Sequence, residues 1–298
     1  MRRLPWGQPT HLPKHGRIRI RPYVYMDLYG IIGYPVKHSL SPLMHNAAFK
    51  ELGIDAEYKK FEVRPEELED FLLNRKDVKG FNITVPHKVK AKQILEREAK
   101  GSKSEYVDLA GAINTVKREG DRSHCTNTDV LGFLTSLKED LKFDHKDKGV
   151  LLIGCGGAGR AVIAGLSNGV RKIYAYDVNK DAIRSSEKLE CISDKEIPEI
   201  VKDCQLLVNA TPIGMKKTDV SPVDKEILHN NLSVYDLVYN IETQLIKDAK
   251  SLGLPCSCGS GMLLYQGAHA FEFWTGKKAP VEVMKQALLK AISCKLIL

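Results

Sequence analysis

The chain has 298 residues, of which 43% are hydrophobic, and this is enough for about two domains with cores of their own. No apolar run approaches the ~18 residues that a membrane-spanning helix needs, so we expect no membrane association. The seven cysteines form no CxxC pair and lack accompanying histidine spacing, which predicts reduced thiols in a cytoplasmic protein and no metal site.

The net charge of +8 is concentrated at the N-terminus. Residues 1–25 carry six Lys or Arg side chains and no acid, which leaves only +2 for the rest of the chain. This segment also holds four prolines and has neither helical nor strand periodicity. We therefore expect residues 1–26 to be a basic, disordered extension, or sequence upstream of a start at Met26, and we expect no nucleic-acid partner.

The orderly part of the chain begins near residue 28. Residues 28–33 predict a short apolar strand, and residues 43–52 predict a helix opened by Ser41 as N-cap and Pro42 in the first turn. Ser39 and Ser41 then lie at a helix N-terminus, where their hydroxyl groups suit a carboxylate. Taken alone, this segment favours a simpler interpretation, in which Ser41 caps the helix and Ser39 is a loop residue.

The next elements lead to a lysine in an unusual place. Alternation predicts a strand over 57–63, an acid-rich helix over 65–74 and a strand over 81–85, followed by a helix that starts at Pro86 and runs to about residue 98. Lys88 falls in the first turn of that helix, where the helix dipole disfavours a cation. This placement suits a proton-transfer group. The alternative is a solvated lysine beside Lys90 and Lys92.

An aspartate opens a later helix. Residues 111–116 predict a strand, and residues 130–141 predict a helix that follows Asn127, Thr128 and Asp129. Asp129 is either the cap of this helix or an ionised group that orients a nearby lysine. The segment lies where the first domain meets the second, so Lys88 and Asp129 can line one cleft.

A glycine-rich loop in mid-chain predicts a dinucleotide site. The apolar run 150–153 is typical of a strand buried on both faces, and residues 161–166 predict a helix. Between them lies the pattern Gly154-x-Gly156-x-x-Gly159, whose glycines permit a tight turn, a close approach of backbone to pyrophosphate, and close packing of helix and strand. The N–H groups at the helix N-terminus would hold the phosphates.

The strand after the loop indicates which dinucleotide is bound. Residues 171–176 predict a strand that ends in Asp177, about 20 residues after the glycines. An aspartate there accepts hydrogen bonds from the ribose hydroxyls and repels a 2′-phosphate, which favours NAD over NADP. Lys180 and Arg184 could offset part of that repulsion, but we expect both to be solvated on the following helix.

Eight short motifs in a fixed order resemble the shikimate dehydrogenase family, including its quinate/shikimate branch. The resemblance spans roughly residues 28–292. The motifs are 39–42 (SLSP), 82–88 (NITVPHK), 111–115 (GAINT), 127–129 (NTD), 154–160 (GCGGAGR), 209–215 (NATPIGM), 236–239 (DLVY) and 261–268 (GMLLYQGA). Any one of them alone is weak evidence, but together they are specific.

The resemblance implies a reaction and roles for individual residues. Family members transfer a hydride reversibly between shikimate and 3-dehydroshikimate with NAD or NADP, and Lys88 and Asp129 would be the pair that moves the proton at the C3 oxygen. Ser39, Ser41 and Tyr239 would bind the ring carboxylate. The residues expected to hold the ring hydroxyls are Asn82, Thr84, Asn114 and Gln266. The residues expected at the cofactor are Gly154, Gly156, Gly157, Ala158, Gly159, Arg160, Asp177, Thr211 and Gly259.

The resemblance also implies the architecture of an α/β protein with two domains. Residues 27–128 would form a substrate-binding domain with a mixed sheet, and residues 129–260 a Rossmann-type, doubly wound dinucleotide-binding domain. The C-terminal helices, within 261–298, would return to the substrate domain, and the protein would be a monomer or a homodimer. One departure follows Tyr239, where the family often has Asn-Pro-x-x-Thr. This chain reads Asn240-Ile241-Glu242-Thr243, which makes the contact of Tyr239 with the carboxylate less certain.

Other functions remain open at this point. One is a dehydrogenase that also accepts quinate. A second is another Rossmann oxidoreductase with two domains, which the combination of Ser39, Ser41, Lys88 and Asp129 disfavours. A third is a non-enzymatic NAD-sensing or nucleic-acid-binding protein, which would need neither a proton-transfer pair nor a carboxylate site.

Overall fold

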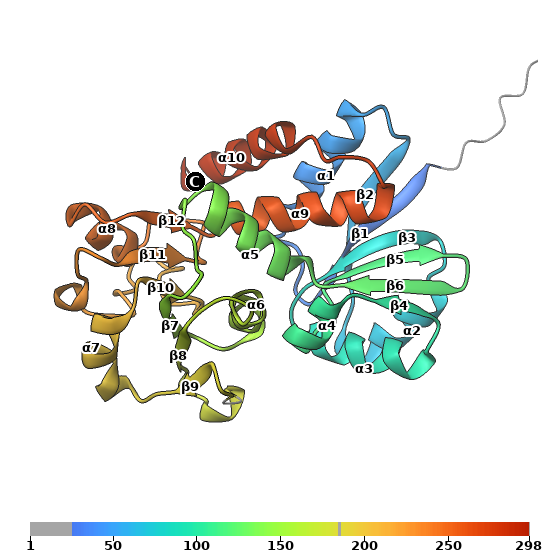
Figure 1. Cartoon of the computed structure of the whole chain (residues 1–298). Coiled ribbons are helices and arrows are strands. Elements are labelled where there is room, and N and C mark those ends of the chain that lie inside the picture. The colour runs from blue at the N-terminus through green and yellow to red at the C-terminus, as the bar shows by residue number, and fades with distance from the viewer. Residues whose placement is uncertain (1–25, 184–185, 298) are drawn as a thin grey trace, which may run out of the picture.

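The structure is a computed structural model that describes residues 26–183 and 186–297, in which two six-stranded sheets lie next to each other (Figure 1). The expected basic extension over residues 1–25, and Arg184, lie outside the described residues. No helix in the described ranges is long and apolar enough to cross a membrane.

The first sheet is mixed, as expected, with strand order β2-β1-β3-β5-β6-β4. β1 pairs in parallel with β2 and β3, and β5 runs antiparallel to both β3 and β6. The strands are β1 Asp27–Gly33, β2 Ala56–Glu62, β3 Val78–Ile83, β4 Gly101–Lys103, β5 Thr115–Glu119 and β6 Arg122–Thr126. The helices between them are α1 Ser41–Glu51, α2 Leu68–Asn74, α3 Lys88–Glu98 and α4 Glu105–Ala110.

The second sheet is entirely parallel, with order β12-β11-β10-β7-β8-β9. All five residues of the central strand β7 are buried, as the apolar run predicted, because helices cover both faces of such a sheet. The strands are β7 Gly149–Ile153, β8 Lys172–Tyr176, β9 Leu189–Cys191, β10 Leu206–Asn209, β11 Ser233–Asp236 and β12 Cys256–Cys258. The helices are α6 Gly157–Leu166, α7 Ile197–Ile200 and α8 Gln244–Ser251.

Three further helices complete the structure. α5 Thr128–Glu139 leads from the first sheet to the second, and α9 Ser260–Thr275 crosses α5 (Figure 1). α10 Val281–Ile297 then packs on α1. The indole N–H of Trp274 on α9 donates to the carbonyl of Val116 in the first sheet, at 2.9 Å. The C-terminal helices therefore return to the N-terminal half, as the family resemblance implied.

Several elements, among them β3, α5 and α6, begin at residues other than those expected, and for three further elements the backbone shows why. α1 begins at Ser41 rather than 43, because Leu40 is the N-cap and accepts from the N–H of Leu43. α3 begins at Lys88 rather than Pro86, because residues 84–87 close a turn first. β5 begins at Thr115 rather than 111, because Gly111 ends α4 at a positive φ of 64° and the chain must reverse there.

The crossing of α5 and α9 is close because α5 has a glycine at the contact. A Cβ on Gly132 would lie 2.6 Å from the backbone nitrogen of Gln266 and 2.8 Å from the carbonyl oxygen of Met262. Both atoms are backbone, so a side chain there would push the two helices apart. The glycine thus sets how near α9 comes to the start of α5.

We expect Gly132→Ala to lower the free energy of unfolding by about 1–3 kcal/mol, because overpacking displaces backbone. Urea denaturation measures the loss. Gly165→Ala on α6 is the control, since the nearest atoms to its Cβ would be side-chain atoms, of Leu134 at 3.1 and 3.3 Å and of Val130 at 3.5 Å. Equal stability of both variants and the unmodified protein would contradict this account of the crossing.

Candidate active site

A cavity of about 340 Å³ opens between the two sheets, and all nine residues predicted to bind or convert a substrate line it. Two of the predicted cofactor residues, Ala158 and Gly259, line it as well. The nine residues are Ser39, Ser41, Asn82, Thr84, Lys88, Asn114, Asp129, Tyr239 and Gln266. They come from both halves of the chain, so folding brings together motifs that are far apart in the sequence.

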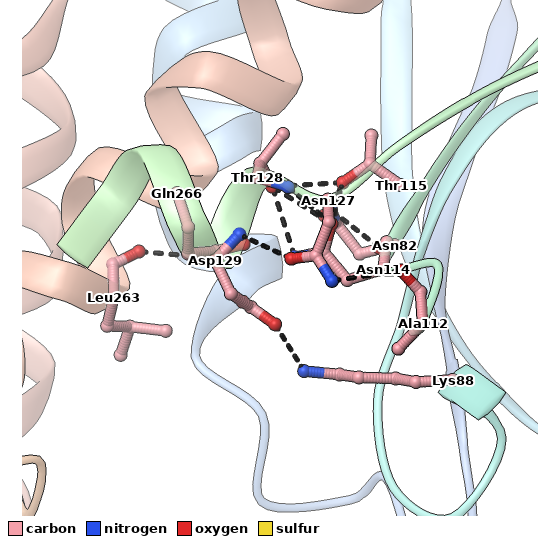
Figure 2. A network of polar contacts seen from close by, with 10 residues as sticks. All are labelled: Asn82, Lys88, Ala112, Asn114, Thr115, Asn127, Thr128, Asp129, Leu263 and Gln266. Carbon is pink, nitrogen blue, oxygen red and sulfur yellow. Dashed lines mark hydrogen bonds and ion pairs between the residues drawn. The ribbon is translucent and has the colours of Figure 1, made fainter. Parts of the chain in front are cut away.

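An ion pair lies in this cavity. The Lys88 ammonium is 2.5 Å from Oδ2 of Asp129, and the two side chains are 19% and 12% exposed (Figure 2). Asn127, not Asp129, caps α5, since its Oδ1 accepts from the N–H of Asp129. The alternative in which Asp129 is the cap is therefore wrong. Its carboxylate is left free to face the lysine, which is not a surface side chain.

Two amide side chains in the cavity have fixed orientations. The N–H of Thr128 donates to Oδ1 of Asn114 at 2.7 Å, and the Thr115 hydroxyl donates to the same oxygen at 2.9 Å. Nδ2 of Asn82 donates to that hydroxyl at 2.9 Å (Figure 2). Nδ2 of Asn82 has a second, long contact with the Asn114 carbonyl oxygen at 3.5 Å, and Nδ2 of Asn114 donates to the Thr128 hydroxyl at 3.1 Å. Each amide nitrogen thus makes one short bond, and its other hydrogen can turn to a hydroxyl oxygen of a ligand.

Gln266 offers the opposite polarity. Its Nε2 donates to the carbonyl of Leu263 at 2.9 Å, one turn back on α9 (Figure 2). The side-chain oxygen is then available as an acceptor. A polyhydroxylated ring in this cavity would meet two amide donors and one amide acceptor.

The serine end of the cavity differs from the expectation. Ser41 is the first residue of α1 and makes no cap, while the Ser39 hydroxyl donates to Ser41 Oγ at 3.2 Å and accepts from its backbone N–H at 3.3 Å. The simpler interpretation, with Ser41 only a cap, is therefore wrong. Tyr239 lines the same end, and burial raises the pKa of its hydroxyl, which stays a neutral donor at neutral pH.

A second cavity of about 630 Å³ lies at the carboxyl ends of the second sheet. Four of the residues expected at the cofactor line it, namely Gly154, Gly156, Asp177 and Thr211. Gly156 lines this cavity while Ala158, two residues on, lines the first, so the glycine loop lies between them. Such a place, at β7 and β10 where the strand order reverses, is typical of dinucleotide sites.

The glycine loop has the geometry that a pyrophosphate needs. Gly154 has a φ of +95°, and a Cβ on Gly159 would lie 2.1 Å from the Gly154 carbonyl oxygen. Beside Gly156 and Gly157 there is open space, since a Cβ on either would meet nothing within 4 Å. The residues therefore fit a dinucleotide whose phosphates rest on the N-terminus of α6. Gly157, Gly159 and Arg160 line neither cavity.

Asp177 holds the loop as well as lining the cavity. Its Oδ2 accepts from the N–H of Cys155 at 2.6 Å and its Oδ1 from the N–H of Asn179 at 2.8 Å. The carboxylate thus points from the end of β8 toward the glycine loop. Ribose hydroxyls would approach a carboxylate that is already in place.

Several lining or supporting residues were not predicted. The nucleotide cavity is also lined by Asp194, Ser221 and Asp224. Thr115 orients Asn82 from behind the first cavity. The three residues of the nucleotide cavity belong to none of the motifs, and Thr115, although it ends the motif 111–115, was given no role, so the sequence offered no signal for what these residues do. Only the packing of distant loops places them there.

A buried carboxylate connects the two cavities. Asp236 is fully buried at the end of β11 and accepts from Asn209 Nδ2 at 2.9 Å, from the N–H of Val238 at 3.0 Å and from the Thr243 hydroxyl at 2.6 Å. Asn209 in turn accepts from the N–H and hydroxyl of Thr211. One side chain therefore ties the loop of the nucleotide cavity to the loop that carries Tyr239.

The loop that departs from the family pattern keeps this connection. Thr243 caps α8 by accepting from the N–H of Ile246, while its hydroxyl donates to Asp236. The absence of the family's proline therefore does not detach the loop behind Tyr239.

Burial raises the pKa of Asp236, against the hydrogen bonds from Thr243, Val238 and Asn209. A carboxyl with a raised pKa contributes its stability below its unfolded pKa of about 3.9 and loses it as the pH rises through the folded pKa. We expect the stability of the unmodified protein relative to Asp236→Asn to fall as the pH rises from about 4 through the folded pKa, by about 1.4 kcal/mol per unit of pKa difference.

Urea unfolding at stepped pH measures this difference. Asp224→Asn, at an exposed residue, is the control and should show a flatter dependence. A difference that grows with pH would contradict the raised pKa.

In the described ranges, no three His, Cys, Asp or Glu side chains are placed to hold a metal ion. The two cavities contain side chains suited to a carboxylate, to hydroxyl groups and to a dinucleotide.

Family models match both ends of the chain. Residues 31–116 match the shikimate dehydrogenase substrate binding domain, and residues 259–289 match the shikimate 5′-dehydrogenase C-terminal domain. Shikimate dehydrogenase (NADP(+)) of Methanopyrus kandleri is 40% identical over 284 residues, which cover 89% of this chain and 95% of the relative.

Solved structures agree with the family models. Shikimate 5-dehydrogenase of Thermus thermophilus, in complex with NADP(H) and shikimate, has a TM-score of 0.80 at 33% identity and covers 89% of this chain and 100% of that one. Quinate dehydrogenase of Corynebacterium glutamicum, in complex with NAD, has a TM-score of 0.80 at 29% identity and covers 89% and 99%.

Proposed function

Because the chain belongs to the shikimate dehydrogenase family, we propose that it reversibly oxidises shikimate to 3-dehydroshikimate with a nicotinamide dinucleotide. One observation carries this proposal. The ion pair of Lys88 and Asp129 lies in a cavity with serines and amides suited to a ring acid, and the glycine loop borders that cavity.

The chain's own residues bind and orient the substrate. Ser39, Ser41 and Tyr239 would donate to the ring carboxylate, close to the N-terminus of α1, whose dipole favours an anion. Asn82 and Asn114 would donate to ring hydroxyls. Holding the ring at several points presents one carbon to the cofactor in a reactive geometry.

The ion pair of Lys88 and Asp129 would transfer the proton. Of the three hydrogens on the Lys88 ammonium, one is directed at Asp129, which leaves two that can reach a substrate oxygen. Lys88 would give a proton to the C3 oxygen when the ketone is reduced and accept one when the alcohol is oxidised. Asp129 would hold the lysine in place. The bound dinucleotide supplies the hydride chemistry.

We expect Lys88→Ala to lower kcat at least ~10²-fold, because general acid-base catalysis is lost. Dinucleotide binding, measured by fluorescence titration, should change little, since Lys88 does not line the second cavity. Lys92→Ala is the matched control, on the same helix and paired with Glu96 near the surface. A near-normal kcat in Lys88→Ala would exclude the proposed role.

We also propose that the protein prefers NAD to NADP. Three carboxylates line the nucleotide cavity, at Asp177, Asp194 and Asp224, and no Lys or Arg of the described chain lines it. A 2′-phosphate near a carboxylate costs about 1–4 kcal/mol at surface-like dielectric, which corresponds to a preference of about 10–10³-fold. The curated relative named above is an NADP(+) enzyme, so this would be a difference from it.

We expect Asp177→Asn to narrow or reverse the preference, because it removes the charge closest to the ribose. The measurement is kcat/KM with NAD and with NADP at saturating shikimate. Asp194→Asn serves as a control farther along the cavity and should have a smaller effect. A lower KM for NADP than for NAD in the unmodified protein would refute the proposal.

Quinate is a second candidate substrate. The acid at residue 177 and the similarity to an NAD-bound quinate dehydrogenase favour it. Initial rates on shikimate and on quinate, each measured with NAD and with NADP, show which of the two substrates the protein prefers.

A further inference from the structure

Tyr58 lies behind the first cavity without lining it. It is on β2 and is 2% exposed, and its hydroxyl donates to Oδ1 of Asn82 at 2.7 Å. Tyr58 thus supports, from outside the cavity, a residue that lines it.

The direction of these bonds follows from a backbone group. The N–H of Thr128 can only donate, so the nearer amide atom of Asn114 is its oxygen, to which the Thr115 hydroxyl donates. Thr115 must then accept from Nδ2 of Asn82, and Oδ1 of Asn82 must face the Tyr58 hydroxyl. Thr115 thus fixes which end of the Asn82 amide is its nitrogen, and the Tyr58 hydroxyl holds the oxygen end in place.

We propose that Tyr58 is a positioning residue that holds the Asn82 amide with an N–H toward the substrate ring. The proposal rests on the proposed function. An amide turned over would place its oxygen where a donor is needed and against the Thr115 oxygen, and it would lose the bond that Tyr58 donates. Tyr58 therefore helps to keep Asn82 ready to donate to a ring hydroxyl oxygen.

The Tyr58 ring is held from two sides. His45 on α1 stacks on it with ring centroids 4.3 Å apart and an interplanar angle of 13°, and Trp274 on α9 packs at 5.9 Å. Burial lowers the pKa of His45 to about 3, so this histidine stays neutral in the working pH range. Burial also raises the pKa of Tyr58 well above its usual range, which keeps its hydroxyl a donor.

Tyr58→Phe tests the proposal because it removes only the hydroxyl and keeps the stacked ring. We expect kcat/KM for shikimate to fall about tenfold, mainly through KM, while KM for the dinucleotide changes less than twofold. Tyr29→Phe is the matched control, since Tyr29 lies in the same buried cluster, packs on the same Trp274 and does not line the cavity. It should leave both KM values unchanged.

A double-mutant cycle identifies the route of the effect. In an Asn82→Ala background, Tyr58→Phe should change kcat/KM for shikimate less than twofold, because its partner is gone. An undiminished effect in that background, or an equal loss for shikimate and the dinucleotide, would overturn the proposal. So would a Tyr58→Phe enzyme within twofold of the unmodified one.

Two further measurements keep the outcome decisive. If Tyr58→Phe does not fold, as judged by thermal unfolding, Thr115→Val removes the bond at the other side of the Asn82 amide and should give the same shikimate-selective loss. An equal loss for shikimate and the dinucleotide there would also overturn the proposal. Turnover of shikimate by the unmodified protein is measured alongside. Its absence would refute the proposed function, whereas turnover without a Tyr58 effect would refute only the positioning role.

Discussion

The convergence of three helix N-termini on one cavity is the constraint on which the site depends. β1, β3 and β6 all run in the same direction, so α1, α3 and α5, which follow them, begin at the same edge of the sheet. Their dipoles favour a bound carboxylate and disfavour a cation. Lys88, in the first turn of α3, is kept there by Asp129, in the first turn of α5. The carboxylate of Asp129 thus offsets the unfavourable interaction between the Lys88 ammonium and the helix dipoles.

The buried polar groups behind the cavity give the site its direction. A hydroxyl group can either donate or accept, but the backbone N–H of Thr128 can only donate. It therefore fixes the orientation of the Asn114 amide and, through Thr115, that of the Asn82 amide. Two asparagines then present donors, while Gln266, bonded to the Leu263 carbonyl, presents an acceptor. For the polyhydroxylated ring that we propose as substrate, these orientations would be set before the ring binds, which would reduce the entropy lost on binding.

The nucleotide cavity shows how one fold serves different cofactors. The glycine loop and the N-terminus of α6 would interact with the pyrophosphate common to both dinucleotides. Discrimination falls to the charge at the end of β8 and in the loops facing it, where this chain has carboxylates. Asp236, buried between the loops, keeps the two cavities in a fixed relation without touching either.

The sequence by itself determined the features that depend on local pattern. These include the buried strand and glycine loop at 150–159, the α/β class, and, through ordered motifs, nine of the residues that line the first cavity. Element starts were less accurate, because a start depends on which neighbour satisfies the first N–H groups, as Asn127 does for Asp129. Tertiary structure alone placed Tyr58 behind Asn82, Asp236 between the loops, and Asp194 and Asp224 in the nucleotide cavity. Their roles come from contacts between residues distant in the chain, and no local spacing encodes such contacts.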